Sequence, residues 1–225
     1  MIILALEFSS EQRSVAVLRS NGDREAGVSP APVIAATKSS PRTLNAFHLI
    51  ETALKQAGLE REDIECLAVG VGPGSYTGIR AAISIAQGWQ LVRELAILSV
   101  SSVECIALQA QAAGLRGRIN FVIDAQRNEF YLAAYEIGAV VLRETEPLRL
   151  TSYSDVAARA QAGETIAGPE VERWLPSGRV VWPDAGALAR LAVDRTDFVS
   201  GEKLEPIYLR AITFVKAPPR RVLPK

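Results

Sequence analysis

One glycine-rich stretch carries the clearest chemical signal in this sequence. Residues 70–80 read Gly-Val-Gly-Pro-Gly-Ser-Tyr-Thr-Gly-Ile-Arg and join an apolar run to a helical pattern. Glycine permits positive φ and a close backbone approach to a ligand, and the N-terminus of the next helix adds partial positive charge. The stretch therefore predicts a phosphate loop that uses Gly72, Gly74, Ser75, Thr77 and Gly78. A tight turn that packs a strand against a helix is equally compatible, and the Gly-Lys-Ser/Thr ending of a Walker A loop is absent.

Histidine and cysteine are too scarce for the common metal and nucleophile sites. The chain has one histidine, His48, and two cysteines, Cys66 and Cys105. A zinc site needs three or four ligands with paired spacing such as CxxC, and the sequence has no such pair. His48 lies in the apolar run Ala46–Ile50, which favours a structural histidine over a catalytic one. We therefore predict no metal site, and we interpret the cysteines as reduced, buried thiols.

Composition and charge place the chain among ordinary globular proteins. Hydrophobic residues make up 48% and charged residues 22% of the 225 residues, and 25 basic residues balance 25 acidic ones. A neutral chain has no long-range field to attract a polyanion, which argues against nucleic-acid binding by this chain alone. The first apolar run ends at Glu7, too early for a signal peptide, and no run is long enough to span a bilayer. We expect a cytoplasmic protein without a membrane partner.

The elements that must position the loop form an alternating pattern in the first half of the chain. The predicted order is a hairpin from strands 2–8 and 14–18, an edge or irregular segment at 25–38, a helix from an N-cap at Ser40 to Gly58, a strand at 64–71, a helix at 78–94, a strand at 96–100 and a helix from Ser101 to about Ala113.

The second half repeats this plan. Its predicted elements are a hairpin from strands 119–123 and 129–135, a strand at 140–150, a helix at 153–162, a strand at 165–167, a helix at 185–193 and a last strand at 206–210. The repetition predicts an α/β fold with an internal duplication. We expect an N-terminal lobe at 1–101, a C-terminal lobe at 102–215 and a flexible basic tail at 216–225.

The helix at 78–94 is apolar on more than one face, so either it is central to the core or one face packs on the core while another meets a partner. Ala81, Ser84 and Gly88 are small enough to let another helix approach closely. We favour a helical interface over a purely buried helix. The predicted partner-facing residues, from this helix and the preceding one, are Leu44, Phe47, His48, Ile79, Ala82, Ile83, Ile85, Ala86 and Trp89.

Several motifs, in the same order, resemble those of the TsaB (YeaZ-like) family of tRNA threonylcarbamoyladenosine biosynthesis proteins, part of the glycoprotease-like ASKHA superfamily. The most specific is Val69–Arg80 followed by Ile-Ala-Gln-Gly at 85–88. Ile3–Ser9, Ile123–Tyr131 and the Glu-Pro-x-Tyr-Leu-Arg segment at Glu205–Arg210 are weaker individually. The resemblance covers nearly the whole chain. It implies two actin-like, ribonuclease H-like lobes, each a mixed sheet that opens with a β-hairpin and is flanked by helices.

The resemblance also implies a function without catalysis. A member of this family docks on TsaD, which transfers the threonylcarbamoyl group to the adenosine beside the anticodon, and the ATPase TsaE joins them. Docking uses the helices at 42–57 and 78–94, which form a four-helix bundle with TsaD as a heterodimer or with a second copy as a homodimer. We therefore predict a scaffold that activates TsaD, has no catalytic residue and no cofactor, and meets tRNA only through the complex.

Four departures from the family pattern argue against direct nucleotide binding, and one of them is a longer stretch at Pro30–Ser39. Glu7-Phe8 replaces Asp-Thr in the first turn, Arg42 stands where a histidine is common, and Gln126 replaces the arginine of Asp-Ala-Arg. One alternative is an ATP-dependent phosphotransferase of the same fold, with Asp124 as base or metal holder. A peptidase is a remote alternative, because no serine or cysteine has a convincing base beside it.

Overall fold

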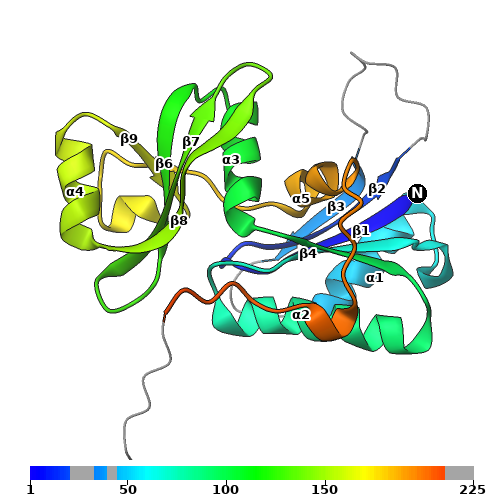
Figure 1. The fold of residues 1–225 in the computed structure, drawn as a ribbon. Helices are drawn as coiled ribbons and strands as arrows, with labels where there is room; N and C mark the ends of the chain where they lie inside the picture. Colours follow the sequence, from blue (N-terminus) through cyan, green and yellow to red (C-terminus); the bar gives the residue numbers. More distant parts are fainter. Residues whose placement is uncertain (21–32, 40–44, 211–225) are drawn as a thin grey trace, which may run out of the picture.

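The computed structural model describes residues 1–20, 33–39 and 45–210, and these residues form two lobes (Figure 1). Each lobe contains one five-stranded sheet. The first sheet has the order β3-β2-β1-β4-β5, with β1 antiparallel to β2 and parallel to β4. Its strands are β1 (Ile2–Glu7), β2 (Arg13–Arg19), β3 (Val33–Ser39), β4 (Cys66–Gly70) and β5 (Ala96–Val100).

The second sheet repeats the topology of the first. Its order, written from the opposite end, is β8-β7-β6-β9-β10, with β6 antiparallel to β7 and parallel to β9. Its strands are β6 (Gly117–Asp124), β7 (Glu129–Ile137), β8 (Leu142–Ser152), β9 (Thr165–Gly168) and β10 (Arg179–Val180). The predicted α/β fold with two actin-like lobes, each opening with a hairpin, is therefore confirmed.

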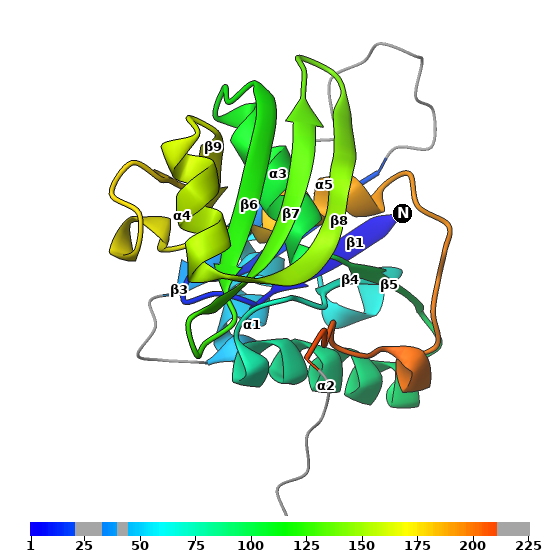
Figure 2. The same cartoon turned by 60° about the vertical axis from the view of Figure 1, so that its left-hand side comes forward.

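Helices cover both faces of both sheets (Figure 2). On the first sheet, α1 and α2 pack on one face and α5 on the other; on the second, α3 and α4 take opposite faces. Their bounds are α1 (Ala46–Ala57), α2 (Tyr76–Val92), α3 (Ser102–Ala112), α4 (Tyr153–Gln161) and α5 (Ala185–Ala192), and short 3₁₀ turns lie at Arg61–Asp63, Val171–Arg173 and Gly201–Lys203.

Strand β1 is apolar from Ile2 to Leu6 because helices pack on both faces of its sheet. Leu4 and Leu6 belong to the core beneath α1 and α2, whereas Ile3 and Ala5 belong to the core beneath α5. Successive side chains of a strand point to opposite faces, so a strand with helices on both sides has to be apolar at every position. All four residues are fully buried.

Two predicted elements need correction. The described helix α1 begins at Ala46, where the Asn45 side chain accepts a 3.0 Å hydrogen bond from the His48 backbone N–H, and the predicted Ser40 cap lies outside the described residues. Pro206–Arg210 was predicted as a strand but forms none in the described part of the chain. These residues join no strand ladder, and the Ile207 N–H donates one isolated hydrogen bond to the Val71 carbonyl.

The chain crosses between the lobes more than once. After β5 it enters α3 in the second lobe, and after β10 it returns to α5, which packs on β1 and β2 of the first. The Ala185 backbone N–H donates to the Ser14 hydroxyl over 2.9 Å. The first lobe thus includes a helix that comes late in the sequence, and the boundary after residue 101 stays a prediction. The predicted tail, 216–225, lies outside the described residues.

None of the helices in the described ranges combines the length and apolarity that a bilayer crossing requires.

Candidate functional site

The glycine-rich loop lies directly on the turn that follows β1. A Cβ at Gly74 would come within 2.1 Å of the Ser9 carbonyl oxygen, and one at Gly78 within 1.9 Å of the Phe8 carbonyl oxygen. Side chains at these two positions would therefore overlap the backbone. The need for glycine at Gly74 and Gly78 is explained by packing of the loop against the Phe8–Ser9 turn.

The backbone N–H groups of the loop already have acceptors at two of its key positions. The Ser75 N–H donates to the Ser9 carbonyl over 2.6 Å, and the Ser75 hydroxyl caps α2 by accepting from the Gly78 N–H at 3.4 Å. Gly72 and Gly78 are buried, whereas Thr77 is exposed, and only Gly74 and Ser75 of the five predicted contacts line the cleft between the lobes. A phosphate role for this loop stays a prediction, and the geometry accounts for the loop as a packing element.

Glu7 is fully buried at the end of β1, beside this loop. Its carboxylate accepts hydrogen bonds from the Ser9 N–H at 2.8 Å and the Ser102 hydroxyl at 3.0 Å. Burial raises the pKa of Glu7 above its ordinary value, although both hydrogen bonds act in the opposite direction. Gly70 makes room for the carboxyl group, because a Cβ there would lie 2.2 Å from Oε2. Glu7 therefore ties the first turn of one lobe to the start of α3.

A cleft of about 340 Å³ opens between the lobes. Glu11, Asp124 and Glu170 are its acidic lining residues, and Arg173 is the one cation among the described residues that line it. Arg173 pairs with Glu170 and lies 3.8 Å from Glu11. Burial, followed by the neighbouring Glu11 carboxyl, raises the pKa of Glu170. The excess of carboxylates makes this cleft a poor environment for phosphate groups.

A second, larger concave site lies between α1 and α2 on the outer side of the first lobe. It encloses about 730 Å³, and its surface is mainly apolar. The small residues Ala81, Ser84 and Gly88 line it along α2, with Phe47 on α1 and Trp89 on α2. We call this site the α1–α2 groove. Arg61, Glu62 and Arg93 also line it, although none of the three belongs to a motif recognised in the sequence.

Burial separates the predicted partner-facing residues into two groups. Ile79, Ala82, Ile83 and Ala86 are at most 5% exposed and belong to the core beneath α2. For these four the prediction is wrong, because the side of α2 that carries them packs on the sheet. The other described members are exposed or partly exposed: Phe47, His48, Ile85 and Trp89. Leu44 lies outside the described residues.

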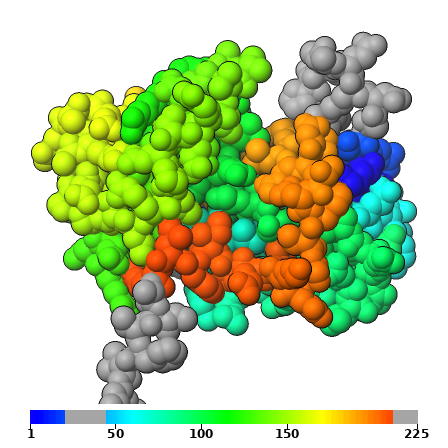
Figure 3. All heavy atoms as spheres, viewed as in Figure 1, coloured from blue at the N-terminus to red at the C-terminus, as the bar shows by residue number. Residues whose placement is uncertain are grey.

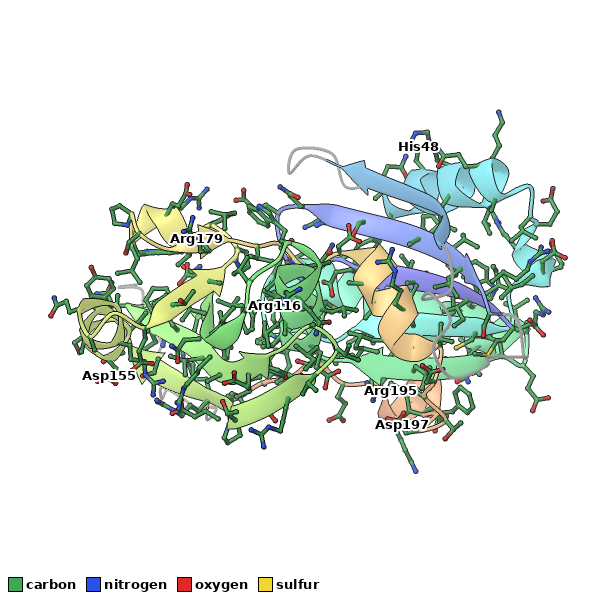
Figure 4. The ribbon with its side chains drawn as sticks, turned by 90° about the horizontal axis from the view of Figure 1, so that it is seen from above. His48, Arg116, Asp155, Arg179, Arg195 and Asp197 are labelled. Carbon is green, nitrogen blue, oxygen red and sulfur yellow. The ribbon has the colours of Figure 1, made fainter. Side chains whose placement is uncertain are left out.

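The exposed members lie on the outside of the molecule. His48 lies on the outer side of α1 and is exposed (Figure 4). Phe47 is 63% exposed, and at the end of α2 Leu91 and Val92 are 88% and 89% exposed. Such large apolar exposure on neighbouring helices is typical of a surface that meets a partner. Whether it does so stays a prediction.

Other residues named in the sequence analysis serve the fold. Both cysteines are buried and free, and burial raises the pKa of both thiols. In the described ranges, no three histidine, cysteine, aspartate or glutamate side chains gather as a set that could hold a metal ion. Asp124 accepts a 2.7 Å hydrogen bond from the Gln126 N–H and so shapes the turn between β6 and β7. Glu129 pairs with Arg210, the last residue of the Glu-Pro-x-Tyr-Leu-Arg motif.

Comparison with known proteins places this architecture in a family. A family profile described as TsaD, tRNA N6-adenosine threonylcarbamoyltransferase, matches residues 20–212. The chain is 30% identical to the tRNA threonylcarbamoyladenosine biosynthesis protein TsaB of Escherichia coli, over 93% of this chain and 95% of that protein. It is 27% identical to TsaB of Haemophilus influenzae, over 98% of each chain.

A solved structure agrees with these relatives. The Pseudomonas aeruginosa protein described as similar to peptidase YEAZ superposes with a TM-score of 0.75 and 25% identity, over 93% of this chain and 99% of that one. The sequence relatives and the structural neighbour therefore indicate the same family. They support a role in the synthesis of threonylcarbamoyladenosine on tRNA. The chain belongs to the TsaB (YeaZ) family.

Proposed function

We propose that this chain is a noncatalytic subunit that binds a TsaD-type tRNA threonylcarbamoyltransferase through the α1–α2 groove and activates it. The observation that carries the proposal is the apolar groove of about 730 Å³ on the outer face of the first lobe. The TsaD profile that matches most of the chain supports a partner built on the same fold. Such a partner would present a similar pair of helices.

The groove has the chemistry of a helix-docking surface. Ala81, Ser84 and Gly88 are spaced three and four residues apart, so they share one side of α2 and let a partner helix approach its backbone. Phe47 and Trp89 supply large apolar area of the kind that dominates interface energy. Two helices from each protein would then form a four-helix bundle. The same face would serve a second copy of this chain in a homodimer when the partner is absent.

The inter-lobe region supports a role without catalysis. The Glu7 carboxylate is fully buried and receives two hydrogen bonds from the protein, so it serves the fold and not a substrate. The cleft beside it is lined by more carboxylates than cations. Transfer chemistry would accordingly take place on the partner, with a TsaE-type ATPase as a further subunit and tRNA reached only through the assembly. We place this assembly in the cytoplasm and keep two lobes, 1–101 and 102–215, as its working division.

Light scattering after size-exclusion chromatography tests the proposal. The chain is measured alone, mixed with the TsaD-type protein of the same organism, and as the groove variant Ser84→Arg. Ser84 is exposed in the isolated chain, so this variant should fold normally. We expect a one-to-one complex for the natural chain and none for Ser84→Arg, while Ala158→Arg on the distant α4 binds normally. A complex that forms equally well with Ser84→Arg would rule out the groove as the docking site.

An ATP-turnover assay on the chain alone addresses the alternative, a phosphotransferase of the same fold. The proposal expects no turnover without the partner. Turnover by the isolated chain that is lost in Asp124→Asn would favour the phosphotransferase instead.

A further inference from the structure

The last described segment of the chain runs over the surface from one lobe to the other (Figure 3). We call Val199–Arg210 the C-terminal strap. It begins on the first lobe, where the Val199 N–H donates to the Ile97 carbonyl over 2.9 Å. Gly201 is then held by two side chains of α2: its carbonyl accepts from Gln87 at 2.9 Å, and its N–H donates to Gln90 at 2.6 Å. The strap is thus anchored to the helix that also lines the groove.

The middle of the strap follows the glycine-rich loop. The Ile207 N–H donates to the carbonyl of Val71 over 2.9 Å. The Tyr208 ring stacks on Tyr76, in the first turn of α2, with ring centres 6.0 Å apart. Arg80, one turn further along α2, lies over the Tyr76 ring at 5.1 Å and donates to its hydroxyl at 2.8 Å. Up to Tyr208, the strap contacts described here are all with the first lobe.

Arg210 crosses to the second lobe. Its guanidinium donates to the Ala125 carbonyl at 3.0 Å and to the Gln126 carbonyl at 3.4 Å, and it forms a short ion pair with Glu129. These three acceptors belong to the turn between β6 and β7 and to its flank. Charge-assisted hydrogen bonds of this kind are stronger than neutral ones.

The turn that Arg210 grips is a strained one. Gln126, Arg127 and Asn128 have φ values of 63°, 60° and 61°, so three successive residues with side chains adopt the left-handed conformation. Such residues persist only where the surroundings hold them. Asp124 and Arg210 supply this support from two sides.

We propose that the C-terminal strap is a latch: Arg210 holds the strained β6–β7 turn against the first lobe and thereby sets the closed arrangement of the two lobes. Tyr76 and Gln126 line opposite sides of the inter-lobe cleft, and the strap contacts both residues. The backbone connections β5–α3 and β10–α5 also link the lobes, as do the Glu7–Ser102 hydrogen bond and the Arg173–Glu11 ion pair. Release of Arg210 would remove the strap from these links and let the cleft widen about the two backbone connections.

Distance measurement between spin labels tests the latch in the chain without a TsaD-type partner. The labelled chain is diluted with an excess of unlabelled chain, so that only distances within one molecule are measured when two copies pair through the α1–α2 groove. Labels are placed at Gln56→Cys on α1 and Ala158→Cys on α4, two exposed positions on different lobes. Both native cysteines are buried, so the label should react with the two introduced thiols. We expect a single narrow distance distribution for the natural strap and a broader one, shifted to longer distance, for Arg210→Ala and for Glu129→Gln. Arg143→Ala, an exposed arginine on β8 outside these contacts, is the matched control and should leave the distribution unchanged.

Hydrogen exchange provides the second readout. Loss of the charge-assisted bonds should speed exchange of the backbone amides at 125–129 by about tenfold or more. Distributions and exchange rates in Arg210→Ala that match those of the natural chain would overturn the latch. Both measurements use the chain without a partner, so their outcome is independent of whether the α1–α2 groove binds a TsaD-type protein.

Discussion

Gly88 offers the sharpest test of the groove, because adding a side chain there should separate folding from partner binding. Gly88 lies in the fourth turn of α2, is exposed, and lines the groove. A Cβ built at this position would meet none of the described atoms within 4 Å. The isolated chain therefore has room for a larger residue, whereas a helix docked in the groove would occupy the same space.

The expected magnitudes follow from this geometry. Gly88→Ala removes the entropic cost of a glycine inside a helix and should stabilise the isolated chain by about 0.5–1 kcal/mol. For a chain of this size that corresponds to a rise of about 1–4 °C in Tm. Gly88→Glu also removes the glycine but places a carboxylate in the docked interface. Burial of that charge without a partner should cost at least about 2 kcal/mol of binding, or about thirtyfold in Kd.

Thermal unfolding and calorimetric titration with the TsaD-type protein measure the two effects separately. Ala158→Glu, an exposed substitution on α4, is the control for the added charge. We expect Gly88→Glu to have a Tm no lower than that of the natural chain and to bind at least about thirtyfold more weakly, and Ala158→Glu to keep the natural binding and Tm. A lower Tm for Gly88→Ala would mean that the space at Gly88 is occupied in the folded chain. An unchanged Kd for Gly88→Glu would refute the groove as the docking surface.

Three further substitutions test the core and the charge networks. Ala82→Asp should abolish cooperative folding in a urea titration, because Ala82 is fully buried and an unpaired carboxylate there costs several kcal/mol. Gly70→Ala should destabilise the chain by about 1–3 kcal/mol in the same assay, because its Cβ would lie 2.2 Å from the Glu7 carboxylate. Hydrogen bonds from Arg159 lower the pKa of Glu146 to about 2, so stability supplied by this carboxylate is present above pH 4.5 and falls as the pH drops towards 2. Glu146→Gln should flatten that part of the stability–pH curve.

A different result would contradict each of these three predictions. Ser84→Asp, on the exposed side of α2, is the control for Ala82→Asp, and equal loss of folding in both would mean that burial is not the cause. Glu7→Asp retracts the carboxyl group by one methylene, so the double variant with Gly70→Ala should lose less than the sum of the single variants. Additive losses would contradict a direct clash. If the free energy of unfolding of Glu146→Gln falls with pH as steeply as that of the natural chain, groups other than Glu146 cause the acid sensitivity.

Glu7 illustrates why a departure from the family pattern needed the structure to be understood. Its position in the first turn suggested a turn less suited to binding nucleotide. The sequence alone, however, does not show which residues surround a carboxylate. The fold brings Ser9 and Ser102 to its two oxygens and leaves a gap at Gly70 that accepts its length. The glutamate is therefore a structural link, and its interpretation depends on residues far apart in the sequence.

Local patterns in the sequence determined the helices, the strands and their repetition. The spacing of apolar residues, the capping residues and the glycines that end helices all act over a few residues. The hairpins, the Gly58 helix end and the Ser101 cap all depend on such neighbours. Only the tertiary structure decided which side of α2 is buried, because an apolar stripe wider than one face matches more than one orientation. Packing on the sheet takes Ala82 and Ala86 into the core and leaves Gly88 and Trp89 in the groove. The contacts of Arg210 with the β6–β7 turn could also be seen only in the tertiary structure, because they join residues that no local sequence pattern connects.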